Sequence, residues 1–217
     1  MHCCRVLRHK AGDSICVIDG RGNRFDCRIL EADPRSTAVE IVESTAIPTH
    51  WGCRITLAVA PTKNMDRMEW MVEKAVEIGV DRIVPLLCQH SERKVLKTER
   101  LTKIAISAMK QSLKTTLPEV CDLTPIKEFL AQPHPGLKFM GYCDRNYPLL
   151  LLPQQYAAGE DVTLLIGPEG DFSPEEVRLA VDAGFVPVSF GQSRLRTETA
   201  AIAALDTVHV LNLLHNA

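Results

Sequence analysis

One turn near the C-terminus combines residue types that suit small-molecule binding. The apolar run from Val162 to Ile166 leads into Gly167-Pro168-Glu169-Gly170, where the glycines allow close backbone approach and the proline fixes φ. Ser173 and Glu176 then form a Ser-x-x-Glu capping box with proline at the first helical position, which predicts a helix after the turn. A strand, a glycine turn and a helix in this order favour a ligand at the carboxyl edge of an open α/β sheet.

A second turn repeats this arrangement further along the chain. Val186 to Phe190 is typical of a strand, Gly191 ends it, and Gln192 to Arg196 lead into a long helix that begins near Thr197. Two such turns with bare glycine backbone could form two walls of one ligand site. The alternative is plain loop chemistry, because glycine and proline end strands in every α/β protein. Spacing alone leaves both interpretations open.

Two segments resemble the RsmE family, namely Leu-Leu-Ile-Gly-Pro-Glu-Gly-Asp-Phe-Ser at 164–173 and Leu-Arg-Thr-Glu-Thr-Ala at 195–200. Members of this family are S-adenosylmethionine-dependent methyltransferases of the SPOUT superfamily that act on N3 of a uridine in 16S ribosomal RNA. The resemblance covers most of the chain, including 60–63, 74–81 and Gln111-Ser112. The chain departs from the family at Asp171, where a third glycine is usual. A carboxylate there could alter the turn or its ligand contacts.

The resemblance also implies an architecture and partners. It implies a SPOUT-type parallel sheet with a C-terminal trefoil knot, preceded by a small PUA-like β-barrel that binds RNA. The implied cofactor is S-adenosyl-L-methionine, and the implied substrate is 16S ribosomal RNA in the assembled small subunit. A homodimer is expected, with Leu205, Val208 and Leu211 of the last helix as a candidate interface. Packing within one chain is the alternative for that apolar stripe.

The resemblance assigns the site residues to the two turns. Those expected to bind the cofactor are Leu165, Ile166, Gly167, Pro168, Glu169, Gly170, Phe190, Gly191, Leu195, Arg196, Thr197, Thr199 and Ala200. Methyl transfer to a ring nitrogen requires that the methyl carbon be aligned with that nitrogen. The uracil ring must also be stabilised as its imide proton leaves. Arg196 is the candidate catalytic cation, with a salt bridge to Glu169 or Glu198 as its alternative role. Thr197 could instead cap the last helix, and no residue is assigned as the base.

Charge is distributed unevenly along the 217-residue chain. The formal net charge is only −2, which by itself gives no sign of nucleic-acid binding. From residue 92 to 114, however, seven Lys or Arg face two Glu, and a local basic patch can bind phosphates. A solvated helix face is the more common meaning of such a run. The candidate RNA-binding residues are Arg8, Lys63, Arg93, Lys94 and Lys97.

The eight cysteines and seven histidines show no metal-ligand spacing. There is no C-x-x-C or H-x-x-x-H pattern, so we expect no metal. Most cysteines lie in apolar runs, as for free thiols in a reducing compartment, and we expect a cytoplasmic protein. No apolar run is long enough for a membrane span, and the N-terminus lacks a signal peptide's apolar core, so no membrane association is expected.

The elements that position these residues fall into two predicted domains. Residues 1–60 show short strands, including a hairpin around 19–23, and predict the PUA-like barrel. The family usually has more residues before this point, so the N-terminus is expected to be trimmed. Residues 61–217 alternate strands with helices and predict a mainly parallel α/β sheet, the SPOUT domain. Within it, 117–160 is irregular apart from a strand at 138–143.

Two other functions compete with an RNA methyltransferase. A non-catalytic RNA-binding or ribosome-assembly factor could keep the fold without the chemistry, but it would have no need of both glycine turns. A nucleotide-binding α/β enzyme would be expected to carry G-x-G-x-x-G or G-x-x-x-x-G-K-[ST], and the sequence has neither. The methyltransferase is therefore the preferred hypothesis.

Overall fold

The chain divides into two compact units in the computed structural model, which describes residues 7–33, 35–142 and 150–216. The first unit is Met1–His50 with Leu113–Leu117, and the second is Trp51–Ser112 with Pro118–Ala217. The boundary was expected at residue 60, but residues 51–60 lie in the second unit. Segment 113–117 returns to the first unit, where Gly22 N donates to Thr115 O (3.0 Å) and Leu117 N to Gly20 O (2.8 Å).

The first unit is an antiparallel sheet in the order β1 (Ser14–Ile18), β2 (Asn23–Ala32), β3 (Thr37–Ala46). The predicted hairpin joins β1 to β2, and Asp19 Oδ1 accepts from the backbone N–H groups of Arg21 and Asn23. Cys27 and Ile29 of β2 are buried, whereas β3 is exposed along nearly its whole length. Over the described residues, the expected barrel is therefore an open three-stranded sheet.

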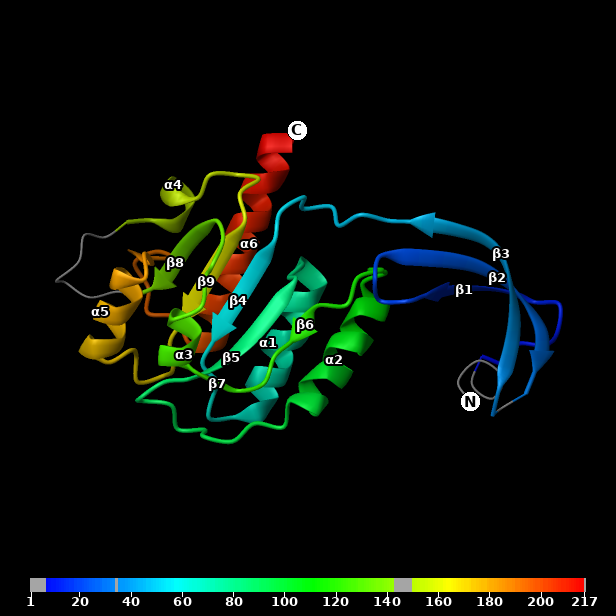
Figure 1. The fold of residues 1–217 in the computed structure, drawn as a ribbon, viewed down its shortest axis with the longest axis horizontal. Helices are drawn as coiled ribbons and strands as arrows, with labels where there is room; N and C mark the ends of the chain where they lie inside the picture. The colour runs from blue at the N-terminus through cyan, green and yellow to red at the C-terminus, as the bar shows by residue number, and fades with distance from the viewer. Residues whose placement is uncertain (1–6, 34, 143–149, 217) are drawn as a thin grey trace. The chain divides into compact units, whose positions relative to one another are not determined.

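The second unit is built on a parallel sheet in the order β10-β8-β9-β4-β5-β6, with β7 also paired to β5 (Figure 1). Its strands are β4 (Ile55–Val59), β5 (Arg82–Leu87), β6 (Glu119–Val120), β7 (Thr124–Pro125), β8 (Leu137–Gly141), β9 (Val162–Ile166) and β10 (Val186–Val188). Every residue of β4 and β9 is buried, which accounts for their apolar runs without alternation. The predicted parallel α/β sheet is confirmed.

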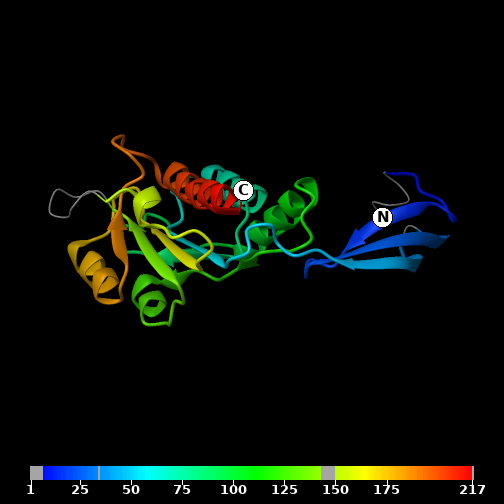
Figure 2. The same cartoon turned by 90° about the horizontal axis from the view of Figure 1, so that it is seen from above.

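Helices cover both faces of this sheet. Figure 2 shows α1 (Met65–Ile78), α2 (Thr98–Gln111) and α6 (Thr197–Asn216) on one face, and α3 (Ile126–Leu130) and α5 (Pro174–Asp182) on the other. The short α4 (Leu152–Gln155) packs against α6. Helix α1 begins at Met65, because Asn64 caps it by accepting from Asp66 N (2.9 Å). Elements β6, β7, α3 and α4 were not predicted.

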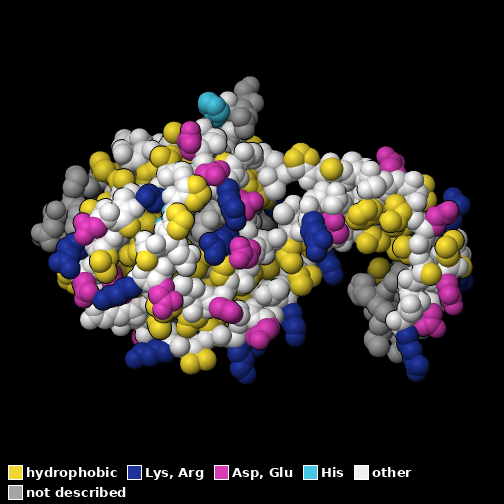
Figure 3. Space-filling view, in the orientation of Figure 1, with side chains coloured by type: hydrophobic (Ala, Val, Ile, Leu, Met, Phe, Trp, Pro, Cys, Tyr) yellow, Lys and Arg dark blue, Asp and Glu magenta, His cyan; other side chains and the backbone are white. Residues whose placement is uncertain are grey.

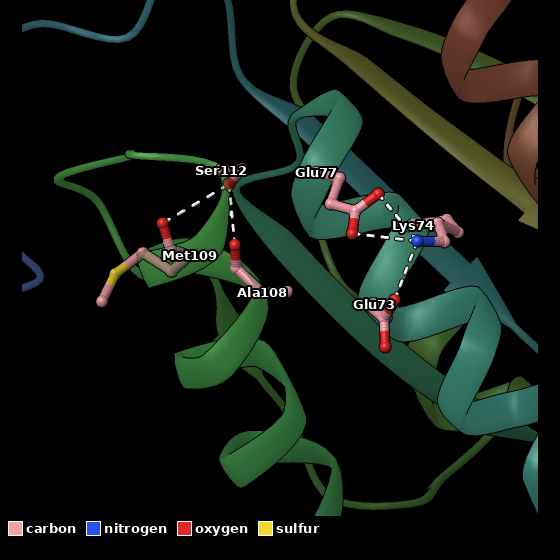
Figure 4. A network of polar contacts seen from close by, with 6 residues as sticks. All are labelled: Glu73, Lys74, Glu77, Ala108, Met109 and Ser112. Atoms are coloured by element: carbon pink, nitrogen blue, oxygen red, sulfur yellow. Dashed lines mark hydrogen bonds and ion pairs between the residues drawn. The ribbon is translucent and has the colours of Figure 1, made fainter. Parts of the chain in front are cut away.

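Two further family-like segments have structural contacts at the ends of α1 and α2 (Figure 4). Lys74 Nζ contacts Glu73 (2.8 Å) and both carboxylate oxygens of Glu77 (2.9 Å each) on the same helix. Ser112 Oγ donates to Ala108 O (2.8 Å) at the end of α2. These contacts account for Lys74, Glu77 and Ser112 without a ligand.

The C-terminal half of α6 is anchored by two buried polar side chains. His209 Nε2 donates to Gly79 O (2.8 Å), and a Cβ on Gly79 would lie 2.7 Å from both His209 and Trp51. Asn212 Oδ1 accepts from Gly159 N (2.9 Å) and from the Tyr156 hydroxyl (3.0 Å). The helix is thus fixed to segments far away in the sequence.

The predicted capping box starts α5. Ser173 Oγ accepts from Glu176 N (3.3 Å), and Glu176 Oε2 accepts from Ser173 N (2.8 Å). Glu176 is buried, and its other carboxylate oxygen accepts from Gln89 N (2.7 Å). One carboxylate therefore joins the α5 N-terminus to the segment that follows β5.

These contacts predict unequal losses of stability. Ser173→Ala should lower the free energy of unfolding by about 1 kcal/mol, as for other lost N-caps. Glu176→Ala should cost about 2 kcal/mol, because it leaves two backbone N–H groups unpaired. Urea denaturation measures both. Glu175→Ala is the control, since its ion pair with Lys127 is exposed and should contribute little. Equal losses for Ser173→Ala and Glu176→Ala would contradict the dual role of Glu176.

Candidate functional site

The two glycine turns meet at one edge of the large sheet. Strand β8 lies between β9 and β10 and is parallel to both, so the carboxyl ends of all three strands point the same way. A cavity of about 1060 Å³ opens there. Its lining comes from all three strand ends and the start of α6: Gly141, Tyr142, Ile166, Gly167, Pro168, Glu169, Asp171, Phe190, Gly191, Gln192, Ser193, Arg194, Leu195, Arg196, Thr197 and Ala200.

Two glycines shape the cavity in different ways. Gly191 has φ of +132°, and a Cβ there would meet nothing within 4 Å, so bare backbone faces free space. At the end of β8, a Cβ on Gly141 would lie 2.7 Å from the Phe190 ring. Gly141 thus allows Phe190 to lie across the neighbouring strand end.

The first turn is fixed by contacts at several atoms. Asp171 N donates to Pro168 O (2.9 Å), which closes the turn. Glu169 Oε1 accepts from Lys63 N (3.0 Å), in the loop after β4. A Cβ on Gly167 would lie 3.0 Å from the buried Phe172 ring, so packing as well as the cavity requires glycine here.

Thr197 ties the second turn to the first. Its hydroxyl donates to Gly167 O (3.0 Å), and its side chain is buried. This hydrogen bond crosses between the ends of β9 and α6. It gives Thr197 a role other than the helix cap considered from the sequence.

Arg196 and its neighbour Arg194 are exposed side chains on the cavity wall. Over the residues that the structure describes, Arg196 forms no ion pair with Glu169 or Glu198. Glu198 is buried and instead faces Arg67 Nε at 3.7 Å. The guanidinium of Arg196 is therefore available to a ligand.

Ten of the thirteen expected cofactor-binding residues line the cavity, and three do not. Leu165 lies in the core with no exposed surface. Gly170 faces His90 rather than the cavity, and Thr199 is exposed on the outer side of α6.

Six lining residues were not predicted: Gly141, Tyr142, Asp171, Gln192, Ser193 and Arg194. The adjacency of β8 to β9 would have indicated Gly141 and Tyr142, but strand order is not visible in the sequence. Asp171 has φ of +62°, in the left-handed region that favours glycine. The aspartate keeps the conformation that glycine would adopt more easily, and its carboxylate accepts from Phe172 N (2.8 Å).

The candidate RNA-binding residues differ in their surroundings. Lys94 and Lys97 are exposed, and Lys63 pairs with Glu92 (2.7 Å) while remaining largely exposed. Arg93 Nη2 donates to Lys63 O (2.7 Å), so Arg93 holds a loop as well as carrying charge. Arg8 lies in the first unit and is exposed. On the face in Figure 3, basic and acidic side chains are interspersed rather than separated by sign.

The cysteines and histidines of the described segments form no metal site. No group of three or more His, Cys, Asp or Glu there could hold a metal ion, and no helix there is long and apolar enough to span a membrane. Cys16, Cys27, Cys53, Cys88 and Cys121 are free thiols, while Cys3, Cys4 and Cys143 lie outside the described residues. Burial raises the pKa of Cys88 to about 12, so this thiol near the site is not a ready nucleophile.

Comparison of the sequence with protein-family models identifies the family of this chain. A family model described as an RNA methyltransferase domain matches residues 49–209, and one described as an RNA methyltransferase PUA domain matches residues 2–42. The chain therefore belongs to the RNA methyltransferase family, and its resemblance to the RsmE branch of that family is confirmed.

Individual relatives support the same family. The sequence is 30% identical to ribosomal RNA small subunit methyltransferase E of Synechocystis sp., over 95% of this chain and 69% of the relative. The crystal structure of a probable rRNA-methyltransferase from Porphyromonas gingivalis matches with a TM-score of 0.93 and 47% identity, covering 99% of this chain and 91% of that one. Ribosomal RNA small subunit methyltransferase E from Neisseria gonorrhoeae, bound to S-adenosyl methionine, matches with a TM-score of 0.86 and 28% identity, covering 97% and 88%.

Proposed function

We propose that this protein transfers a methyl group from S-adenosylmethionine to N3 of a uridine in 16S ribosomal RNA. The observation that carries the proposal is the cavity in which the two family turns meet, with Thr197 joining them. The family match and the S-adenosyl methionine bound to the Neisseria relative support it.

The cavity suits this cofactor in size and chemistry. Its volume of about 1060 Å³ is at the upper end of the range for small-molecule sites. Ile166, Leu195 and Ala200 offer apolar surface for a purine ring, and the bare backbone at Gly191 allows close approach. Glu169 and Asp171 place carboxylates at the wall of the cavity for the cationic end of the cofactor.

The residues of the chain would align and stabilise the reacting base. The bound cofactor supplies an electrophilic methyl group with a good leaving group. N3 of the uracil would give its proton to solvent, which puts negative charge on the ring. The N3–methyl bond would then form as the sulfur–methyl bond breaks and the sulfonium leaves as a neutral thioether. Arg196 lines the cavity with a guanidinium that is free to stabilise this charge. The walls of the cavity hold the two reactants in line, which is a positioning effect.

The proposal includes the finer properties that the resemblance implies. The substrate is 16S ribosomal RNA in the assembled small subunit, and the protein acts in the cytoplasm. The first unit, residues 1–50 with 113–117, would contribute a PUA-like RNA-binding domain, and Arg8 would contact phosphate. A C-terminal trefoil knot is also proposed, supported by the order β10-β8-β9 and by the contact of Thr197 with Gly167.

Calorimetric titration with S-adenosylmethionine tests the cofactor assignment. Transfer of labelled methyl from the cofactor to unmethylated small subunits, followed by mapping of the modified base, tests the reaction. The competing function is a non-catalytic RNA-binding or assembly factor. Binding of small subunits without cofactor binding or methyl transfer would favour that alternative and refute the enzyme.

The basic segment should contribute to RNA affinity. We expect the double variant Lys94→Ala, Lys97→Ala to weaken RNA binding and reduce the slope of log affinity against log salt by roughly 1.5, because two phosphate contacts are lost. Arg93 is left intact because it also holds the loop after β4.

Titrations of labelled ribosomal RNA at several salt concentrations measure this slope. Lys127→Ala, Arg178→Ala is the charge-matched control, on the helices of the opposite face of the sheet. An unchanged slope in the Lys94, Lys97 double variant would show that these two lysines are solvated surface residues that do not contact RNA.

The homodimer is proposed with a revised interface. Leu205 and Val208 are fully buried within the chain and Leu211 is partly buried, so intrachain packing accounts for the stripe named from the sequence. The exposed apolar residues of α6 are Val210 (45%), Leu213 (61%) and Leu214 (70%), which lie on one side of the helix.

The double variant Leu213→Lys, Leu214→Lys should therefore be monomeric. Light scattering at micromolar concentration should give the mass of two chains for the unmodified protein and of one chain for the variant. Val181→Lys, an exposed apolar position on α5, is the control that should remain dimeric. A monomeric unmodified protein that methylates RNA would contradict the proposal.

A further inference from the structure

The segment after β5 holds the cofactor-side turn from outside the cavity. Strands β9, β4 and β5 are neighbours, so the segment 88–93 lies near the loops that follow β4 and β9. Its first residues are fixed, because Cys88 N donates to Ser91 Oγ (3.0 Å) and Gln89 N donates to the buried Glu176 (2.7 Å). The segment is therefore a firm support for the turn beside it.

His90 makes the contact with the turn. Its Nδ1 lies 3.1 Å from Gly170 O and 2.9 Å from Asp171 O. Both partners are carbonyl oxygens, which only accept, so Nδ1 must carry the hydrogen that it shares between them. The tautomer of His90 is thus set by the backbone of the turn.

Gly170 is shaped to this contact. A Cβ on Gly170 would lie 3.0 Å from the Cβ of His90, a separation tighter than nearly all real contacts. Gly170 does not line the cavity. The approach of His90, rather than a ligand, therefore explains why this position lacks a side chain.

A second connection reaches the same turn through the loop after β4. Arg93 Nη2 donates to Lys63 O (2.7 Å), and Lys63 N donates to Glu169 Oε1 (3.0 Å). Glu169 is a cavity residue. The segment 88–93 therefore meets the turn directly at His90 and indirectly at Glu169.

We propose that His90 is a positioning residue, which holds the 167–171 turn in the geometry that binds the cofactor. The identity of that cofactor as S-adenosylmethionine rests on the proposed function above. His90 touches neither the cavity nor a ligand, and acts only through the two carbonyl groups.

Substitutions that move or remove the donor test this role. Asparagine places its side-chain N–H near the position of Nδ1, whereas glutamine places it near that of Nε2. Titration with S-adenosylmethionine should show His90→Ala and His90→Gln weakened about tenfold, and His90→Asn within about threefold of the unmodified protein. Gln89→Ala is the control, because only the backbone of Gln89 is used. Its affinity should be unchanged.

Hydrogen exchange on the cofactor-free protein gives a readout independent of the cofactor. His90→Ala should speed exchange of the Asp171 amide, which donates to Pro168 O, about tenfold, with no change in β9. Unchanged exchange, or an Asn variant as weak as the Ala variant, would overturn the proposal. If His90→Ala speeds exchange of the Asp171 amide as expected but the unmodified protein does not bind S-adenosylmethionine, only the proposed function is refuted.

Discussion

Arg196→Ala is expected to lower the rate of methyl transfer by about a hundredfold to a thousandfold, as seen when one stabilising donor is removed from an active site. Its affinity for S-adenosylmethionine should change only a few-fold. The reason is that Arg196 is exposed on the cavity wall, and neither Glu169 nor Glu198 neutralises it. Its charge would be needed chiefly when the target base becomes anionic.

Single-turnover methyl transfer and calorimetry separate these two effects. Arg194→Ala tests whether Arg194, rather than Arg196, is the catalytic cation, because Arg194 lies on the same cavity wall. Arg178→Ala, an exposed arginine of α5 away from the cavity, is the control for loss of charge. If Arg196→Ala keeps more than about a tenth of the rate, the catalytic assignment is wrong.

Ala200→Leu is expected to weaken cofactor binding about tenfold to a hundredfold. Extra side-chain carbons in a well-packed site typically cost about 1–3 kcal/mol, which corresponds to this change in affinity. Ala200 lines the cavity from the first turns of α6. The helix propensity of leucine is only slightly below that of alanine, so the substitution should not disturb the helix. The added carbons would occupy cavity volume without disturbing the glycine turns.

This substitution separates binding from folding more clearly than Gly167→Val would. A valine side chain at that position would clash with the Phe172 ring, so misfolding could not be told apart from loss of binding. The matched control is Ala203→Leu, the same change in α6 at a residue that does not line the cavity. Both variants should keep the thermal unfolding midpoint within a few degrees. Equal affinities for the two would remove Ala200 from the cofactor site.

The local parts of this site could be predicted from the sequence. The capping box of Ser173 and Glu176, the buried run of β9 and the turn after it depend on residues close together in the chain. Chemical type and spacing are enough to specify such features. The resemblance then identified which turns belonged together.

The remaining parts depend on contacts between distant segments. Gly141 and Tyr142 line the cavity only because β8 pairs with β9, and Gly170 lacks a side chain because of His90, eighty positions away in the sequence. Strands β6 and β7 have two residues each, so their periodicity carries no signal. Tertiary pairing alone defines them.

The anchoring of α6 also determines when the cavity can form during synthesis. The wall at Leu195–Ala200 leads into α6, whose other end is fixed by His209 and Asn212 to Gly79 and Gly159. A nascent chain that lacks this helix has the turn at Gly167 but no Thr197 hydroxyl to bind it. The cavity is therefore completed only after the chain has been translated through Asn212, and translation products that stop before this helix should lack it.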